Sequence, residues 1–248
     1  MRPKNEPFHL GDFYLCAGFK VFGDPKANLD SARIYKIFSE ADAFWRQYII
    51  TLKYYKKFPT YPLPPFTIPT YQTSPMQGDS SGLVASDTQD QWDNPVYQSF
   101  FKYNEDPAWI TVFFIPGNHF KNSPATAQTM TPPIKDANGC ITGFRIYIFL
   151  TDQAEPIIFA HEIGHALFTR AENCGLTLDN PGPPYNGDPT HDSDQWNLMY
   201  GGPVTFPHFE GSINRQVPYL QQAQFYKATS SPLLDCGLPN SHLITPLS

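Results

Sequence analysis

About two thirds of the way along the sequence, residues 161–165 read His-Glu-Ile-Gly-His, which puts two histidines four positions apart with a glutamate beside the first. An α-helix advances about 100° per residue, so residues four apart lie one above the other on one face. Two imidazoles placed in this way can hold one metal ion at about 2.0–2.1 Å. We therefore predict His161 and His165 as metal ligands, and Glu162 as the general base that accepts a proton from water.

The sequence around this pentapeptide favours a buried helix. With seven histidines and seven glutamates in 248 residues, composition alone predicts the pattern HExxH about 0.005 times. The alternative, an exposed helix that carries two histidines by chance, fits poorly with the apolar residues around the motif. A predicted strand at Gly143–Leu150 precedes the helix, Pro156 suits its first turn, and Gly175 is its predicted stop.

Upstream of this helix, apolar patterns predict a sheet and one further long helix. Apolar residues at spacings of three and four, from Ile34 to Tyr48, predict an amphipathic helix that Asn28 or Asp30 can cap. Short apolar runs predict strands at residues 13–22, 49–55 and 109–115. Residues 76–107 are polar and rich in turns, so we expect irregular chain there.

The order of these elements predicts a fold of the α/β or α+β class in a single domain, residues 1–248. We expect an N-terminal lobe over about residues 1–175 and a loop-rich C-terminal lobe over about residues 176–248, with a helix near residues 218–226. Six prolines between residues 59 and 75 exclude a helix or inner strand, and predict a stiff surface loop or, alternatively, a docking site for a partner.

A second polar cluster, residues 191–202, ends in Asn197-Leu198-Met199-Tyr200-Gly201-Gly202. Together with residues 161–165 it resembles the metzincin clan of zinc peptidases, in which a tight turn bearing a methionine lies beneath the metal. In that resemblance Met199 is the methionine of the turn. It implies a metzincin-like fold, with a twisted mixed sheet and two long helices in the N-terminal lobe.

The resemblance is incomplete at the third ligand. Metzincins continue the pattern as HExxHxxGxxH, whereas Phe168 and Ala171 stand at the glycine and final histidine positions here. Two histidines leave a zinc ion one protein ligand short of a catalytic site, so another ligand must come from elsewhere. Glu172 cannot share the ion with His161, because it would lie about 16 Å further along the same helix.

The predicted third ligand is His191, the one histidine in the sequence between the helix and Met199. Prolines and glycines between residues 181 and 187 allow the intervening chain to loop out as an insertion. Asp194 is the alternative, because a carboxylate can replace an imidazole on zinc. The predicted spacing to the third ligand is therefore much longer than in the metzincin pattern.

These residues imply a Zn²⁺-dependent endopeptidase that acts on a peptide or protein substrate. By resemblance, an edge strand would pair with the substrate backbone, and either Trp109–Ile115 or the stretch 117–131 could supply it. One alternative is a binding or adhesion module that retains a structural zinc site, against which the intact Glu162 argues. A thermolysin-like site with Glu210 as ligand is a further alternative, although Glu210 lies in sequence that makes a poor helix.

Composition excludes some functions. The formal net charge of −6 argues against nucleic acid as a partner, because phosphates require a basic face. No apolar run approaches the roughly 20 residues that a membrane-spanning helix needs. We expect a monomer.

Four cysteines, Cys16, Cys140, Cys174 and Cys236, lie far apart and form no metal-binding pair. The four cysteines could be free buried thiols or could form two disulfides, and free thiols are at least as well favoured. The first residues show no secretory signal, because polar residues and Pro3 interrupt any apolar stretch. We nevertheless expect an exported protein from which such a signal has been removed.

Overall fold

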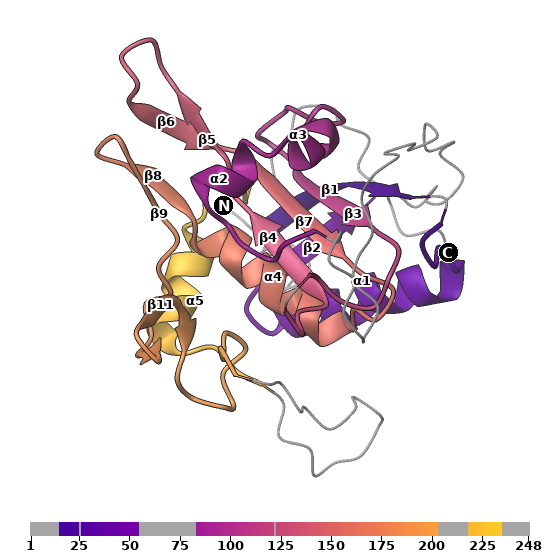
Figure 1. The fold of residues 1–248 in the computed structure, drawn as a ribbon. Helices are drawn as coiled ribbons and strands as arrows, with labels where there is room; N and C mark the ends of the chain where they lie inside the picture. The colour runs from indigo at the N-terminus through magenta and orange to yellow at the C-terminus, as the bar shows by residue number, and fades with distance from the viewer. Residues whose placement is uncertain (1–14, 25, 55–82, 122, 203–217, 235–248) are drawn as a thin grey trace, which may run out of the picture.

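A computed structural model describes residues 15–24, 26–54, 83–121, 123–202 and 218–234 of the chain. Its centre is a five-stranded mixed sheet in the order β2-β1-β3-β7-β4 (Figure 1). The first four of these strands run parallel, and β4 pairs antiparallel with β7. The strands are β1 (Leu15–Gly23), β2 (Ile50–Tyr54), β3 (Ile110–Phe114), β7 (Ile146–Leu150) and β4 (Ala127–Met130).

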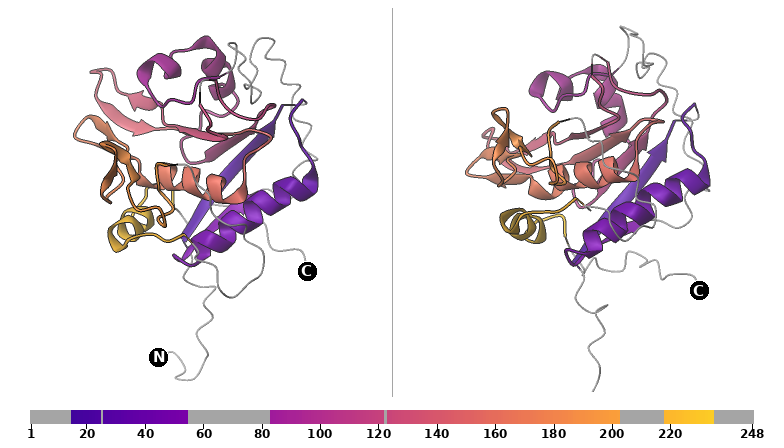
Figure 2. Two further views of the ribbon diagram at one scale, coloured as in Figure 1. Left: turned by 60° about the horizontal axis from the view of Figure 1, so that its bottom comes forward. Right: turned by 90° about the horizontal axis from the view of Figure 1, so that it is seen from below.

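The two long helices, α1 (Ser31–Arg46) and α4 (Pro156–Phe168), cover one face of the sheet, and the short helices α2 (Gln89–Trp92) and α3 (Pro95–Phe101) cover the other (Figure 2). Strand side chains alternate between these faces. In β7, for example, Ile148 packs in the core with α1 and α4, whereas the next residue, Phe149, packs with α3. The predicted mixed fold of strands and few helices is confirmed.

Helix α1 follows its prediction closely. The predicted apolar stripe is buried at Ile34, Ile37, Phe38, Ala41 and Trp45. Asp30 caps the first turn by accepting a hydrogen bond from Ala32 N at 3.3 Å. The indole Nε1 of Trp45 donates to Ala160 O at 3.2 Å, inside the contact between α1 and α4. Helix α1 therefore supports α4 directly.

Several local predictions were wrong. Residues 76–107 were expected to be irregular, but their described part contains α2 and α3. The single strand predicted at 143–150 is divided at Arg145 into β6 (Ile141–Phe144) and β7, which belong to different sheets. Of the two candidates for the edge strand, β3 lies between β1 and β7, whereas β4, within the stretch 117–131, is an outer strand of the sheet among the described residues.

Helix α4 was predicted to stop at Gly175 but ends at Phe168. The buried Thr169 is extended, and its hydroxyl donates to His165 O at 2.9 Å, which satisfies a carbonyl at the helix end. The chain then forms a hairpin of β8 (Arg170–Glu172) and β9 (Gly175–Thr177). Glu172 therefore lies in β8 and not on α4, whereas the sequence analysis had placed it further along the helix of His161.

Two hairpins project side by side from the sheet (Figure 1). One is β8–β9, and the other joins β5 (Pro133–Lys135) to β6. A disulfide between Cys140 and Cys174 links them, with the two Cα atoms 4.5 Å apart. The sequence left free thiols and disulfides both open, and these two cysteines form a disulfide because the packing of the hairpins brings them together.

The rest of the described C-terminal chain holds β10 (Pro184–Tyr185), β11 (Asp188–Asp192) and α5 (Gln222–Thr229). α5 matches the helix predicted near residues 218–226 and packs against α4. The proline-rich stretch 59–75 lies outside the described residues, as do Glu210 and Cys236. Within the described part of the chain, no helix has the length and apolar character needed to cross a membrane.

Candidate metal centre

Helix α4 carries His161, Glu162 and His165 on its side facing a cleft beside the sheet. His161 and Glu162 are buried, and His165 is half-buried. The helix is apolar on its other faces, where Ile163, Ala166 and Leu167 pack into the core. Burial of those faces fixes the rotation of the helix, and so fixes the direction in which the polar face points.

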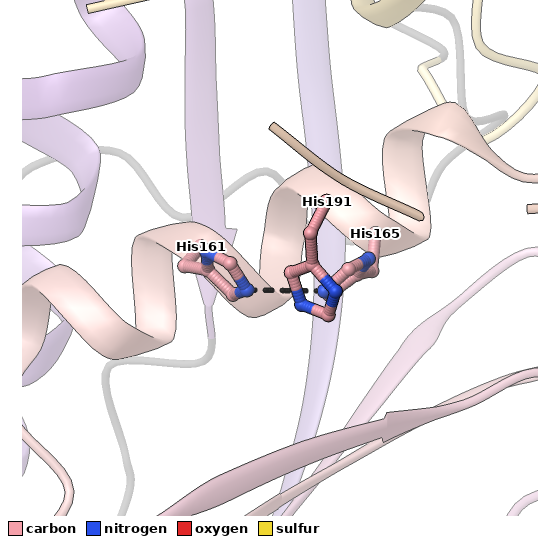
Figure 3. Close-up of side chains that lie close together, drawn as sticks. All are labelled: His161, His165 and His191. Atoms are coloured by element: carbon pink, nitrogen blue, oxygen red, sulfur yellow. Dashed lines mark hydrogen bonds between the residues drawn. The ribbon is translucent and has the colours of Figure 1, made fainter. Parts of the chain in front are cut away.

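His191 belongs to β11, and its side chain lies beside those of His161 and His165 (Figure 3). The three histidines each offer a ring nitrogen, and these nitrogens all lie within 4.8 Å of one another. The Nε2 atoms of His161 and His165 are 3.0 Å apart, and the His191 ring stacks on that of His161 with centroids 5.3 Å apart. The structure therefore brings together the three histidines that the sequence singled out.

The distances and hydrogen bonds of these rings fit a metal ion. Two nitrogens bound at about 2.0–2.1 Å in a tetrahedral site are about 3.3 Å apart, close to the 3.0 Å between His161 and His165. His161 Nδ1 lies 2.7 Å from Leu198 O, which can only accept, so Nδ1 carries the proton and Nε2 keeps its lone pair. This is the tautomer that a ligand histidine needs.

The electrostatic environment keeps the helix histidines neutral. Burial, together with the nearby His191, lowers the pKa of His161 from 6.5 to about 4, although the bond to Leu198 O opposes this. Burial and the two neighbouring imidazoles also lower the pKa of His165 well below its ordinary value. Neutral imidazole is the form that binds a metal, so these rings need lose no proton to bind an ion at neutral pH.

Glu162 lies beside these rings, and one of its carboxylate oxygens accepts a hydrogen bond. Thr129 of β4 donates its hydroxyl to Glu162 Oε2 at 2.6 Å. Burial raises the pKa of Glu162 from 4.5 to about 7, while the Thr129 bonds lower it and the charge of Asp87 raises it further. A cation at the three imidazoles would lower it again, because an opposite charge favours the carboxylate.

A tight turn, Asn197–Tyr200, packs against α4. Met199 is fully buried, and its sulfur lies so close to Gly164 that a Cβ built there would be 2.4 Å from it. The turn is closed by Tyr200 N, which donates to Asn197 O at 3.1 Å, and by Met199 N, which donates to the Asn197 side chain at 2.9 Å. Met199 therefore packs against α4 at Gly164, and its place beneath a metal ion stays a prediction.

A buried polar network anchors the His191 loop, the stretch from Asn180 to Asp194 that includes β11. Gln224 of α5 donates to Asn180 at 2.6 Å and to Asp192 and Asn197 at 3.1 Å each, and it accepts from Asn197 at 2.7 Å. All four side chains are buried. Because unpaired buried polar groups are costly, this network ties α5, the His191 loop and the Met199 turn into one arrangement.

The histidines lie in a cleft of about 1000 Å³. One wall is the edge strand β4 with the residues just before it, and another is the chain around Tyr185 and Tyr200. β4 is the last strand of the sheet in the described part of the chain, and only one of its edges is paired there. An unpaired edge presents backbone donors and acceptors that an extended chain can bind.

The other candidate residues lie elsewhere. Asp194 accepts hydrogen bonds from the Tyr219 hydroxyl and from Trp196 N, and it is outside the histidine cluster. His119 bonds the neighbouring carbonyl of Phe120 at 3.0 Å. Sequence reasoning missed Thr129, because a single threonine in a short, weakly patterned strand carries no signal of its own.

Comparisons with known proteins give little further information. No protein-family model matches the chain, and no curated protein matches it by sequence. Among solved structures, metalloproteinase-II from Bacteroides fragilis is similar over 92% of this chain, with 15% sequence identity and a TM-score of 0.41. The match covers 54% of that structure, so this chain spans about half of its length.

Proposed function

We propose that this chain is a zinc-dependent endopeptidase of the metzincin type, with His161, His165 and His191 as the zinc ligands and Glu162 as the general base. The observation that carries the proposal is the meeting of three imidazoles from two distant segments beside a buried carboxylate. The donor set is one that zinc prefers, with three protein ligands and room for a fourth.

Each side chain has a separate task in this proposal. When bound, zinc would polarise the scissile carbonyl and lower the pKa of the attacking water. Thr129 holds Oε2 of Glu162, and no hydrogen bond from the described residues occupies Oε1. Glu162 takes the proton of the water at that free oxygen and passes it to the leaving amine, so the carboxylate is regenerated in each cycle.

The turn at Asn197–Tyr200 is the proposed counterpart of the metzincin Met-turn. Its support is the buried contact of Met199 with Gly164 and the hydrogen bond from His161 to Leu198 O. Through these contacts the turn holds both the helix and one ligand ring. The proposed site differs from the metzincin pattern in its long spacing between His165 and His191.

The proposed substrate is an extended peptide or protein segment. It would add as a further strand to the free edge of β4, which borders the same cleft as the histidines. Backbone pairing of this kind places a peptide bond beside the base without requiring one particular side chain, and so suits an endopeptidase.

The test compares Glu162→Gln with Glu155→Gln, a matched control at an exposed glutamate that lines the same cleft. Glu162→Gln should retain zinc, measured by elemental analysis, but lose cleavage of casein by several orders of magnitude, because the amide cannot take the proton. Glu155→Gln should behave as the wild type. A chelator should abolish cleavage, and zinc should restore it.

The competing function is a binding or adhesion module with a structural zinc. Wild-type protein that holds one zinc but cleaves neither casein nor a peptide library would establish that reading. Near-wild-type cleavage by Glu162→Gln would instead show that another group is the base.

Two wider proposals accompany this function. We propose that the described residues form one domain, since one core cluster includes residues from β1, α1, α4 and α5. We also propose that the protein is exported, because the disulfide between Cys140 and Cys174 is typical of oxidising compartments.

A further inference from the structure

His191 is held differently from the other two histidines. His161 and His165 are fixed by the helix that carries them, whereas His191 comes from the short strand β11 and is part-exposed. Its Nδ1 lies 2.6 Å from Asp188 Oδ2, three residues earlier in the chain. This contact restrains the orientation of the ring.

Asp188 is itself oriented by Thr190. The backbone N of Thr190 donates to Asp188 Oδ1 at 2.9 Å, and its hydroxyl donates to the same oxygen at 2.7 Å. The two carboxylate oxygens therefore have separate partners: Oδ1 receives the Thr190 donors, and Oδ2 faces the His191 ring. The Thr190 hydroxyl oxygen is also 3.1 Å from His191 Nδ1.

This arrangement determines which nitrogen of His191 is protonated. An ionised carboxylate only accepts hydrogen bonds, so the proton of the neutral ring stays on Nδ1 and the lone pair on Nε2. The carbonyl of Leu198 has the same effect on His161. A carboxylate adds a negative charge, which makes the ring a stronger donor to a metal than a neutral carbonyl does.

We propose that Asp188 is a positioning residue of the metal centre, which fixes the ring and the tautomer of His191 so that Nε2 serves as the third ligand. This inference rests on the proposed zinc site. It assigns Asp188 no contact with the substrate or the ion. Outer carboxylates of this kind typically change metal affinity by about 10- to 100-fold.

Two substitutions separate this role from a merely structural one. In Asp188→Asn, the donors of Thr190 would hold the amide oxygen at the Oδ1 position, so the NH₂ group would face His191 Nδ1. That nitrogen would then have to accept, which moves the ring proton to Nε2 and removes the ligand lone pair. Asp188→Ala only frees the ring. Asn, although isosteric, should therefore be at least as damaging as Ala.

The experiment measures the zinc dissociation constant of each full-length variant by competition with a chromogenic chelator. Both Asp188 variants should bind zinc about 10- to 100-fold more weakly than the wild type. They should also alter the visible spectrum of the cobalt-substituted protein. Asp194→Asn, on the same loop, is the matched control and should stay within about twofold of the wild type. Thermal unfolding of the zinc-free proteins checks that each variant is folded.

The outcomes separate the two proposals. If the wild type and His191→Ala both fail to hold zinc, the proposed function itself is wrong. If the wild type binds zinc and His191→Ala loses it, but Asp188→Asn binds as the wild type does, only the inference about Asp188 is overturned. A greater loss in Asp188→Ala than in Asp188→Asn also overturns it, because steric packing would then be the cause. Loss of zinc in Asp194→Asn would transfer the role to Asp194.

Discussion

The substitution Gly164→Ala tests whether the close approach of the Met199 turn to α4 matters for stability and for the site. A Cβ at this position would lie 2.4 Å from Met199 Sδ and 3.2 Å from its Cε, so the methionine would have to move. Two effects oppose each other. Alanine is favoured over glycine inside a helix by about 1 kcal/mol, whereas an added methyl in a packed core costs about 1–3 kcal/mol.

We therefore expect a net loss of stability of about 0–2 kcal/mol, since the packing term is at least as large as the helix term. For a chain of this length, each kcal/mol corresponds to about 2–4 °C in Tm. The displacement should also weaken zinc binding. Leu198, beside Met199, supplies the carbonyl that fixes the His161 ring at 2.7 Å, so a shifted turn misplaces that ligand.

Thermal unfolding of the zinc-free protein measures the stability change without a contribution from lost metal, and chelator competition measures affinity separately. Gly143→Ala is the control, because a Cβ there would be 3.6 Å from Ile134, an ordinary contact. Its Tm should be unchanged or slightly higher. The reasoning is refuted if Gly164→Ala raises Tm by several degrees and leaves zinc affinity unchanged, since the close approach to Met199 would then carry no energy.

Three further predictions concern other parts of the site. Thr129→Val should lower turnover about tenfold and Thr129→Ser should retain it, because the hydroxyl holds Glu162 at 2.6 Å; equal rates for the two variants would contradict this. Replacing both Cys140 and Cys174 by serine should lower the free energy of unfolding by about 3–4 kcal/mol for a separation of 34 residues, and an unchanged guanidinium midpoint would count against it. Folding raises the pKa of Glu162 from 4.5 to about 7 without metal, so its buried charge destabilises the fold fully above pH 7 and less as pH falls towards 4.5. Zinc-free Glu162→Gln should therefore exceed the wild type in stability by about 1–3 kcal/mol at pH 8 in urea unfolding, and a constant difference down to pH 4.5 would argue against the shift.

The two long helices, α1 and α4, were readable from the sequence because their signals repeat within one segment. The spacing of His161 and His165 fixes their shared face once the helix forms, and the apolar period of α1 identifies its buried side. The third histidine was selected by its place before Met199, since no other histidine lies between the helix and that turn. These inferences need no knowledge of how distant segments pack.

The early end of α4 shows where local signals fail. Gly175 looked like a helix stop, yet the helix ends at Phe168, because Thr169 is buried and bonds His165 O. Where the helix stops depends on what the following residues pack against. The pairing of Cys140 with Cys174 likewise depends on two hairpins lying side by side, and no spacing rule in the sequence reports that contact.

The sequence thus specified the chemical groups of the candidate site, and tertiary structure decided how they are held. Thr129 reaches Glu162 because β4 takes the edge of the sheet, and Gln224 reaches the His191 loop because α5 packs on α4. Both contacts join residues more than 30 positions apart in the chain. Such contacts arise from the burial of whole faces against one another, which is a collective property that no single stretch of sequence encodes.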